Sequence, residues 1–238
     1  MIRVEPQTEP VDFNDKVRTP GLRAIAEMVG ERSDRTVGRT YKKICDRRED
    51  IPCKKFRDYW KHAIPDLLVA YGQICAYTCL KINAVTGSAT VDHYLAKSKH
   101  WDKVYEWNNY RLACGRINAR KGTHDDILDP FEVEDDWFEL ELVGFQVIPA
   151  EYLQPDIDAR VQKTIDRLGL NDFRKERAEK AEEYFSGNVS LKYLVKESPF
   201  VARELIRQGR LRPEDQTPEN LAIKQRYDLI VAVRKSHV

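Results

Sequence analysis

One short segment in the middle of the chain constrains its fold most. The turn-forming triplet at residues 86–88 is followed by β-branched residues, which predicts a short strand over residues 89–95. Farther along, Asn108 or Asn109 can cap a helix that Gly122 is well placed to end. The predicted order is strand, loop and helix, so the chain must fold with both kinds of element.

The N-terminal part is predicted to be mainly helical. Three prolines in the first twenty residues indicate an extended arm, and apolar residues then recur at helical spacing over residues 22–29 and 53–71. Beyond the central segment, residues 137–148 alternate in polarity around Gly144, which predicts a second hairpin.

The C-terminal part also shows helix boundaries. An apolar stripe over residues 157–168 ends at Gly169, and Asn171 can cap the charged helix that follows. Ser198-Pro199 and Thr217-Pro218 each place a capping residue before a proline, so two more helices are predicted to begin there. We expect a helical N-terminal segment over residues 1–70, a core over residues 71–150 and a helical C-terminal segment over residues 151–238.

Composition is typical of an ordinary globular protein. The 238 residues are 42% hydrophobic and 33% charged, with a formal net charge of +1, so total charge gives no argument for nucleic-acid binding. Charge is nevertheless uneven, because residues 32–61 contain eleven Lys or Arg against five acids. This basic run is either the solvated side of two helices or a DNA contact, and we favour the solvated side.

The lack of an apolar targeting segment and the odd number of cysteines predict a cytoplasmic protein without membrane contact. No apolar run approaches the roughly 20 residues that cross a bilayer, and residues 1–10 lack the apolar stretch of a secretory signal. The five cysteines are an odd number in a chain without signs of export. This argues against a disulfide framework and leaves reduced thiols or a metal site.

The predicted strand and helix carry residues suited to phosphodiester hydrolysis. That reaction needs a base to activate water and a divalent cation to neutralise charge, and hard cations prefer carboxylate and amide oxygens. Asp92 and Asn118 offer such oxygens. His93 can accept a proton near neutral pH. Taken alone, His93 is more often a hydrogen-bonded structural histidine, and its neighbours make catalysis the preferred interpretation.

The same stretch resembles the HNH (ββα-metal) endonucleases. The resemblance lies in Asp92-His93, in Trp107-Asn108-Asn109 and in the closing motif Asn118-Ala119-Arg120-Lys121-Gly122. It implies an α+β protein with a central ββα-metal unit, and an endonuclease that cleaves DNA, RNA not being excluded, with Mg²⁺ or Mn²⁺. By this resemblance Asp92 and Asn118 hold the metal and His93 is the general base. Asn109 orients the histidine or supports the loop, with helix capping as its structural alternative, and Lys121 contacts phosphate.

A narrower resemblance is to the HNH nucleases that accompany ATPases in anti-phage systems of the Septu and retron type. Matching pieces are Cys75-Ala76-Tyr77, residues 107–114, Asp129-Pro130-Phe131 and residues 164–171. This implies a role in antiviral defence and an ATPase partner. We expect a helical segment containing Phe200, Leu205 and Ile206 to provide the docking surface. The alternative is a non-catalytic assembly or nucleic-acid-binding module on a degenerate HNH scaffold.

One departure from the family concerns a structural zinc. Many members bind it with two Cys-x-x-Cys pairs, and such sites normally need four ligands. Here Cys75 and Cys79 are one residue too far apart, and Cys114 is followed by Ile117 where the fourth thiolate belongs. We therefore predict no zinc, with Ile117 packed among apolar residues.

Positive charge accompanies the predicted site. Residues 107–124 contain no acid. The residues expected to follow a phosphate backbone are Lys97, Lys99, Arg111, Arg116, Arg120 and Lys121.

Overall fold

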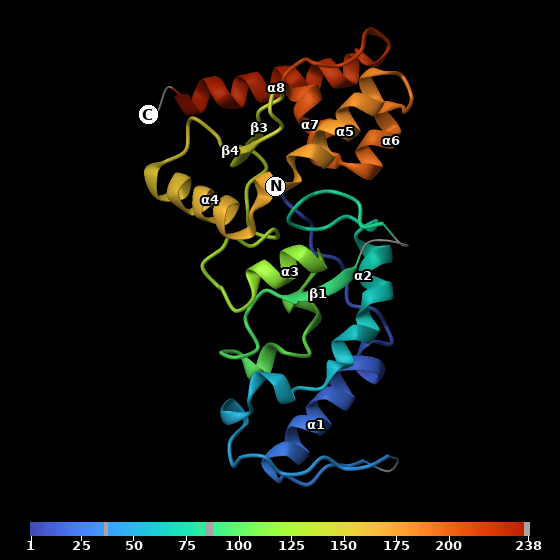
Figure 1. Cartoon of the computed structure of the whole chain (residues 1–238), viewed down its shortest axis with the longest axis vertical. Helices are drawn as coiled ribbons and strands as arrows, with labels where there is room; N and C mark the ends of the chain where they lie inside the picture. Colours follow the sequence, from blue (N-terminus) through green and yellow to red (C-terminus); the bar gives the residue numbers. More distant parts are fainter. Residues whose placement is uncertain (36–37, 84–87, 236–238) are drawn as a thin grey trace. The chain divides into compact units, whose positions relative to one another are not determined.

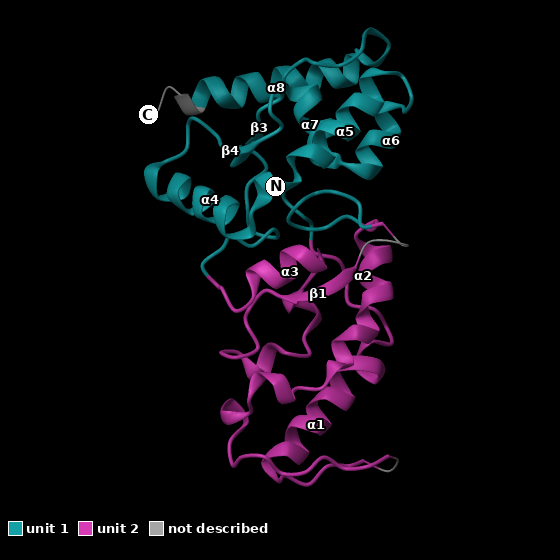
Figure 2. Ribbon diagram, viewed as in Figure 1, with its two compact units in different colours: residues 1–5, 74–82, 126–238 teal, residues 6–73, 83–125 magenta. Residues whose placement is uncertain are grey.

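The computed structural model describes residues 1–35, 38–83 and 88–235. It is mostly helical with two small antiparallel hairpins, in agreement with the expected α+β class (Figure 1). The chain forms two compact units (Figure 2). Unit 1 comprises Met1–Glu5, Ile74–Ile82 and Asp126–Val238, and unit 2 comprises Pro6–Gln73 and Asn83–Asp125. The division into domains near residues 70 and 150 stays a prediction.

Helices α1 and α2 of unit 2 precede its hairpin. An extended arm leads into a π-helical turn, Asn14–Arg18, and then into helix α1, Thr19–Val29, which ends at Gly30 with a left-handed φ of 82°. The segment over residues 53–71, expected to be helical, is not one continuous α-helix. Short 3₁₀ turns, Cys53–Lys55 and Asp58–Ala63, precede helix α2, Ile64–Ala70.

Pro65 explains why no α-helix runs through this segment. Pro52 caps the first 3₁₀ turn, and Pro65 lies in the first turn of α2. A proline ring clashes with the carbonyl one helical turn upstream and lacks an N–H donor, so an α-helix can begin at Pro65 and cannot continue through it. The sequence contained this signal, and the apolar periodicity hid it.

A hairpin followed by a helix forms the centre of unit 2. Strand β1, Ala89–His93, pairs antiparallel with β2, Tyr110–Cys114, and helix α3, Gly115–Lys121, follows directly and ends at Gly122. Figure 1 shows α3 lying beside β1. The expected strand and the glycine stop are confirmed. The turn expected at residues 86–88 falls largely on residues 84–87, outside the described residues.

The helix predicted to start at Asn108 or Asn109 starts later. Residues 110–114 form β2 instead, and four of its five side chains are buried. For these residues, the free-energy difference between helix and strand propensity is smaller than the free energy gained by burying their side chains. Pairing with β1 therefore decides the conformation. Asn109 is consequently not a helix cap.

Aromatic side chains form the core on one side of this hairpin. The Phe13 ring packs edge-on against Trp107 at 5.7 Å and against Tyr110 at 5.8 Å. Gly21 on α1 faces Tyr105 so closely that a Cβ atom at Gly21 would lie 2.3 Å from the tyrosine ring. Only glycine fits there, which explains how α1 approaches the aromatic layer.

Unit 1 contains the second hairpin and five helices among its described residues. Strands β3, Phe138–Leu140, and β4, Val147–Pro149, pair antiparallel within the predicted range. The helices are α4, Pro155–Leu168; α5, Arg174–Phe185; α6, Leu191–Glu197; α7, Pro199–Arg207; and α8, Pro218–Lys235. The predicted starts at Pro199 and Pro218 and the stop at Gly169 are confirmed. No helix in these described ranges, or in those of unit 2, is long and apolar enough to cross a membrane.

Two predicted roles in unit 1 are wrong. The Asn171 side chain exchanges hydrogen bonds with the Val147 backbone, at 2.7 and 3.1 Å, and therefore holds the hairpin instead of capping a helix. Of the three residues expected to form a docking surface, Phe200 and Leu205 are at most 1% exposed and belong to the core, and Ile206 is half-buried. The apolar face of α7 is simply the face that packs inward.

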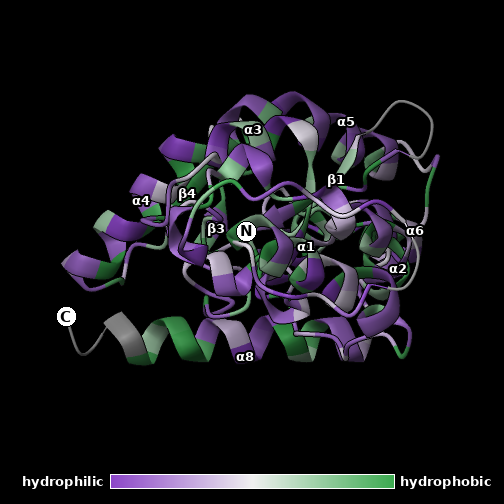
Figure 3. Cartoon of the chain, turned by 90° about the horizontal axis from the view of Figure 1, so that it is seen from below, coloured by the Kyte–Doolittle hydropathy of each residue, from purple (hydrophilic) through white to green (hydrophobic). Residues whose placement is uncertain are grey.

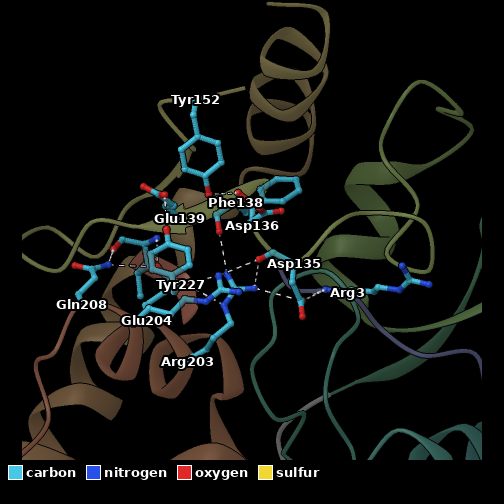
Figure 4. A network of polar contacts seen from close by, with 12 residues as sticks. Arg3, Asp135, Asp136, Phe138, Glu139, Tyr152, Arg203, Glu204, Gln208 and Tyr227 are labelled. Atoms are coloured by element: carbon cyan, nitrogen blue, oxygen red, sulfur yellow. Dashed lines mark hydrogen bonds and ion pairs between the residues drawn. The ribbon is translucent and has the colours of Figure 1, made fainter. Parts of the chain in front are cut away.

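A partly buried polar network joins α7 and α8 to β3 (Figure 4). Arg203 donates to the Phe138 backbone oxygen at 2.9 Å and pairs with the buried Glu204 at 2.9 Å. Tyr227 on α8 donates to Glu139 at 2.6 Å. Apolar residues are also exposed along α8, whose surface mixes hydrophobic and hydrophilic residues in Figure 3.

Candidate active site

A buried ion pair joins the hairpin to α3. The Asp92 side chain on β1 is 1% exposed, and Lys121 at the end of α3 is fully buried. Lys121 Nζ lies 3.1 Å from Asp92 Oδ1. It also donates to the backbone oxygens of His93, at 2.8 Å, and Tyr94, at 3.0 Å. A lysine ammonium has three N–H donors, so three oxygens satisfy it.

Arg111 brings a second buried cation to the same part of the hairpin. It lies opposite Asp92 in the strand register and is 3% exposed. Its Nη1 donates to the backbone oxygens of Asn108, at 2.8 Å, and Tyr110, at 3.1 Å. Arg111 and Lys121 were both expected to contact phosphate. In this structure their donors face internal oxygens, so neither is available to a polyanion at the surface.

Asn118 lies one turn before Lys121, on the face of α3 that packs against β1. Its Nδ2 donates to Thr90 Oγ1 and to the Val91 backbone oxygen, both at 3.1 Å. Thr90 and Asp92 are two residues apart on a strand, so their side chains leave the same face of the hairpin. The structure therefore brings Asp92, Asn118 and Lys121 to one side of β1.

The His93 ring lies on the other face of the strand. Successive strand residues point to opposite faces. The ring packs edge-on against Trp60 at 5.0 Å and against Tyr110 at 5.1 Å. The three side chains expected to share one ion and one water are thus divided between the two faces of β1.

The protonation state of His93 follows from its surroundings. The side chain is 7% exposed, and burial, reinforced by the positive charge of Lys97, lowers its pKa to about 3. The imidazole is therefore neutral at pH 7. Its Nε2 lies 2.9 Å from the Val104 backbone oxygen, which can only accept, so Nε2 carries the proton. The remaining lone pair is on Nδ1, the atom that can accept a proton from water.

Lys97 and Trp60 complete the surroundings of His93. Lys97 Nζ lies 3.9 Å from the centre of the Trp60 ring, a cation–π contact. Burial lowers the pKa of Lys97. From the sequence Trp60 was one member of an apolar helical stripe, and no spacing signal tied it to His93. Only the tertiary contact between the 3₁₀ turn and β1 identifies it.

Asn109 organises the loop between the two strands. Its Oδ1 accepts a hydrogen bond from the Leu95 N–H at 2.7 Å. Its Nδ2 donates to the backbone oxygens of Leu95, at 3.2 Å, and Lys103, at 3.0 Å. The side chain is 3% exposed, so these bonds are made in a dry environment. This geometry is that of a loop support, one of the two roles implied by the resemblance.

The remaining predicted phosphate contacts differ in exposure. Lys99 and Arg116 are exposed, and Arg120 is half-buried. Lys99 pairs with Asp125 at 2.7 Å. Their contact with nucleic acid stays a prediction.

The cysteines considered for zinc fall in different units. Cys75 and Cys79 are buried in unit 1, and Cys114 is half-buried in unit 2. Burial raises the pKa of the Cys79 thiol, which disfavours the thiolate that a metal needs. Ile117 is fully buried, as expected. The expectation that the protein lacks zinc stays a prediction.

The donors beside Asp92 suit a hard cation in their chemistry. Mg²⁺ keeps several waters and binds through one or two carboxylates, so one carboxylate and one carboxamide oxygen are a sufficient protein contribution. Within the described ranges there is no group of three or more His, Cys, Asp or Glu arranged to hold a metal. Because Lys121 already neutralises Asp92, a divalent cation at this carboxylate has to compete with the ammonium group.

Comparison with known proteins gives one partial similarity. No model of a known protein family matches the chain. A stretch of 56 residues is 32% identical to the Septu protein PtuB of Bacillus thuringiensis. This stretch is 24% of the chain and 22% of PtuB, so the chain matches less than a quarter of that relative. The chain is therefore distantly similar to a Septu protein over part of its length, in agreement with the Septu-type resemblance of its motifs.

Proposed function

We propose that this protein is a metal-dependent endonuclease of HNH type that hydrolyses phosphodiester bonds in DNA. One observation carries the proposal: a hairpin and the helix after it gather a carboxylate and a carboxamide, Asp92 and Asn118, at the strand that also bears a neutral histidine. The element order is strand, strand, helix, which is the order that the motif resemblance implies.

In this mechanism His93 accepts the proton of the attacking water at Nδ1, because Nε2 is bonded to Val104. Asp92 and Asn118 would hold Mg²⁺ or Mn²⁺, which would supply charge neutralisation for the phosphate and the leaving oxygen. Asn109 fixes the loop that carries Val104, and so fixes the tautomer and the ring of His93. Since His93 and Asp92 leave opposite faces of β1, water has to reach the imidazole at the end of the strand.

Cleavage of plasmid DNA tests this function. Wild type, His93→Ala and Asp92→Asn are incubated with plasmid in Mg²⁺, Mn²⁺, Ca²⁺ or EDTA, and a structured RNA is run in parallel. We expect nicking by the wild type in Mg²⁺ or Mn²⁺. His93→Ala should lose at least about a hundredfold, because general-base catalysis contributes 10²–10⁴-fold. Asp92→Asn should also lose cleavage, because it removes the ionised metal ligand. Equal cleavage by His93→Ala and wild type contradicts the mechanism.

A second candidate function is a non-catalytic nucleic-acid-binding or assembly module. The observation that favours it is the Asp92–Lys121 pair, since the ammonium group takes the carboxylate that a metal would use. The same reactions discriminate, because a binding module retards DNA in a native gel in every metal and leaves the plasmid intact.

The biological role that we propose is effector nuclease in antiviral defence, together with an ATPase partner. It is supported by the motif resemblance and by the partial similarity to a Septu protein. Co-purification from cells challenged with phage, followed by identification of an ATPase in stable stoichiometry, tests it. A protein that remains alone in such cells contradicts the partnership.

A further inference from the structure

A basic cleft lies in unit 2, outside the residues of the candidate active site. It encloses about 650 Å³ between the segment around Tyr41 and the 3₁₀ turns that follow Pro52. Its charged lining is Lys42, Lys54, Lys55, Arg57 and Asp58. These residues come from the basic run at residues 32–61, which the sequence analysis favoured as a merely solvated surface.

The positive charge of this cleft is not neutralised from within. The four cations are exposed, and in the part of the chain that the structure describes none of them forms an ion pair. The one acid of the lining, Asp58, is paired with Lys61. Other basic residues of the same run behave differently, since Lys43 pairs with Asp46, and Arg48 with Glu31. The cleft therefore brings together four cations of the run that have no acidic partner in the described part of the chain.

The wall of the cleft is held by specific contacts. The Arg57 guanidinium lies 4.2 Å from the centre of the Tyr41 ring, and the Tyr41 and Tyr59 hydroxyl groups are hydrogen-bonded at 2.9 Å. The Arg57 backbone oxygen accepts a hydrogen bond from Tyr105 at 2.9 Å. Arg57 is thus presented in a fixed position, which lowers the entropy cost of binding an anion.

The cleft is also close to the histidine of the candidate site. Arg57 caps the 3₁₀ turn Asp58–Ala63, and Trp60 in this turn contacts the His93 ring at 5.0 Å. The same short turn therefore carries a cation of the cleft at its start and, within it, the residue that packs on the imidazole.

We propose that this cleft binds the phosphate backbone of the nucleic acid next to the scissile position. The proposal rests on the proposed nuclease function and names the surface that holds its substrate. Four cations spread along an open cleft suit a polyanion better than a single small anion, which requires donors that converge on one point. Recognition through phosphates predicts no preference for base sequence at this surface.

Equilibrium binding separates this proposal from catalysis. Fluorescein-labelled duplex DNA, single-stranded DNA and RNA are titrated by anisotropy in EDTA, so that cutting plays no part. The variant Lys54→Gln/Lys55→Gln removes two exposed cations, and Lys175→Gln/Lys192→Gln in unit 1 removes two exposed cations elsewhere. The two double variants have the same net charge, so an effect of total charge on DNA binding changes the affinity of both equally.

We expect the cleft variant to bind duplex DNA roughly tenfold more weakly at 0.1 M salt. The slope of log K against log salt should fall by about 1.8, that is, by 0.9 for each lost phosphate contact. The unit 1 variant should match the wild type. Equal binding by the cleft variant and the unit 1 variant, or no binding by the wild type, overturns the proposal. If the wild type binds DNA normally and does not cleave it, the nuclease function is contradicted and the binding role of the cleft is still supported. The three probes show which nucleic acid the cleft prefers.

Discussion

Lys121 Nζ lies 3.1 Å from Asp92 Oδ1 in an environment that excludes water from both side chains. The pair connects the last turn of α3 to β1, and the ammonium group also binds the two backbone oxygens that follow Asp92 in the chain. This contact both stabilises the hairpin-helix unit and controls access to the carboxylate.

Removal of Lys121 should destabilise the protein strongly. The variant Lys121→Met removes the ammonium group that pairs with the buried Asp92 carboxylate, and we expect a loss of about 3–5 kcal/mol in the free energy of unfolding. The double variant Asp92→Asn/Lys121→Met removes both charges and should recover part of this loss. Urea unfolding of the wild type, both single variants and the double variant gives the coupling energy. Additive effects of the two substitutions would show that the pair does not act as a unit.

A metal titration tests whether the Lys121 ammonium group competes with a divalent cation for the Asp92 carboxylate. In Lys121→Ala the carboxylate loses its internal cation, and we expect Mn²⁺ to bind at least about tenfold more tightly than in the wild type. Asp92→Asn should abolish this binding, since it removes the ionised ligand. Mn²⁺ titration followed by electron paramagnetic resonance measures the free ion directly. Weaker Mn²⁺ binding in Lys121→Ala would mean that Lys121 supports the metal site and does not compete for it.

The buried imidazole of His93 should make stability depend on pH. Its pKa is lowered to about 3 in the folded protein, against about 6.5 when unfolded. Above pH 6.5 both states are neutral and the stabilisation is complete. Below this pH His93 is protonated in the unfolded state and stays neutral in the folded state. The free energy of unfolding therefore falls as the pH approaches 3.

The expected loss between pH 6.5 and pH 5 is about 2 kcal/mol from this residue, at 1.4 kcal/mol per pH unit. Urea unfolding at both pH values measures it, with His93→Gln expected to remove the difference. His62→Gln, which replaces an exposed imidazole in the same unit, is the matched control and should retain it. A pH dependence unchanged in His93→Gln would assign the effect to another group.

Asn109 should be needed for the order of the loop that follows β1. Asn109→Ala removes three buried hydrogen bonds and leaves backbone groups of Leu95 and Lys103 unpaired, which costs about 1–3 kcal/mol. Hydrogen exchange of residues 95–103 should become faster. Asn108→Ala changes the exposed neighbouring side chain and should leave both properties as in the wild type. Similar exchange in the two variants would exclude a loop-supporting role.

Residues with fixed backbone preferences predicted the helix boundaries well. Pro199 and Pro218 begin helices, and Gly169 ends one with a positive φ of 60°, because proline and glycine act through their own chemistry at that position. The segment at residues 110–114 shows the opposite case. Its residues tolerate helix or strand, and pairing with β1 selects the strand.

The site also has features that the sequence predicted and features that depend on tertiary contacts. Asp92, His93, Asn109 and Asn118 were chosen from their chemistry and order in the sequence, and the structure places all four on or beside one hairpin. The burial of Arg111 and Lys121 was not predictable, since a basic residue near an active site has the same sequence spacing whether it faces solvent or a carboxylate. The contacts of Trp60 with His93 and with Lys97 join residues more than thirty positions apart.

The sequence by itself thus determined which chemical groups are present and where local backbone constraints start and stop its helices. Only the tertiary structure decided that the His93 ring packs on Trp60, which cation neutralises which carboxylate, and which basic residues stay exposed in a cleft. The physical reason is that burial and charge pairing depend on contacts between distant segments, whereas proline, glycine and strand alternation act within a few residues.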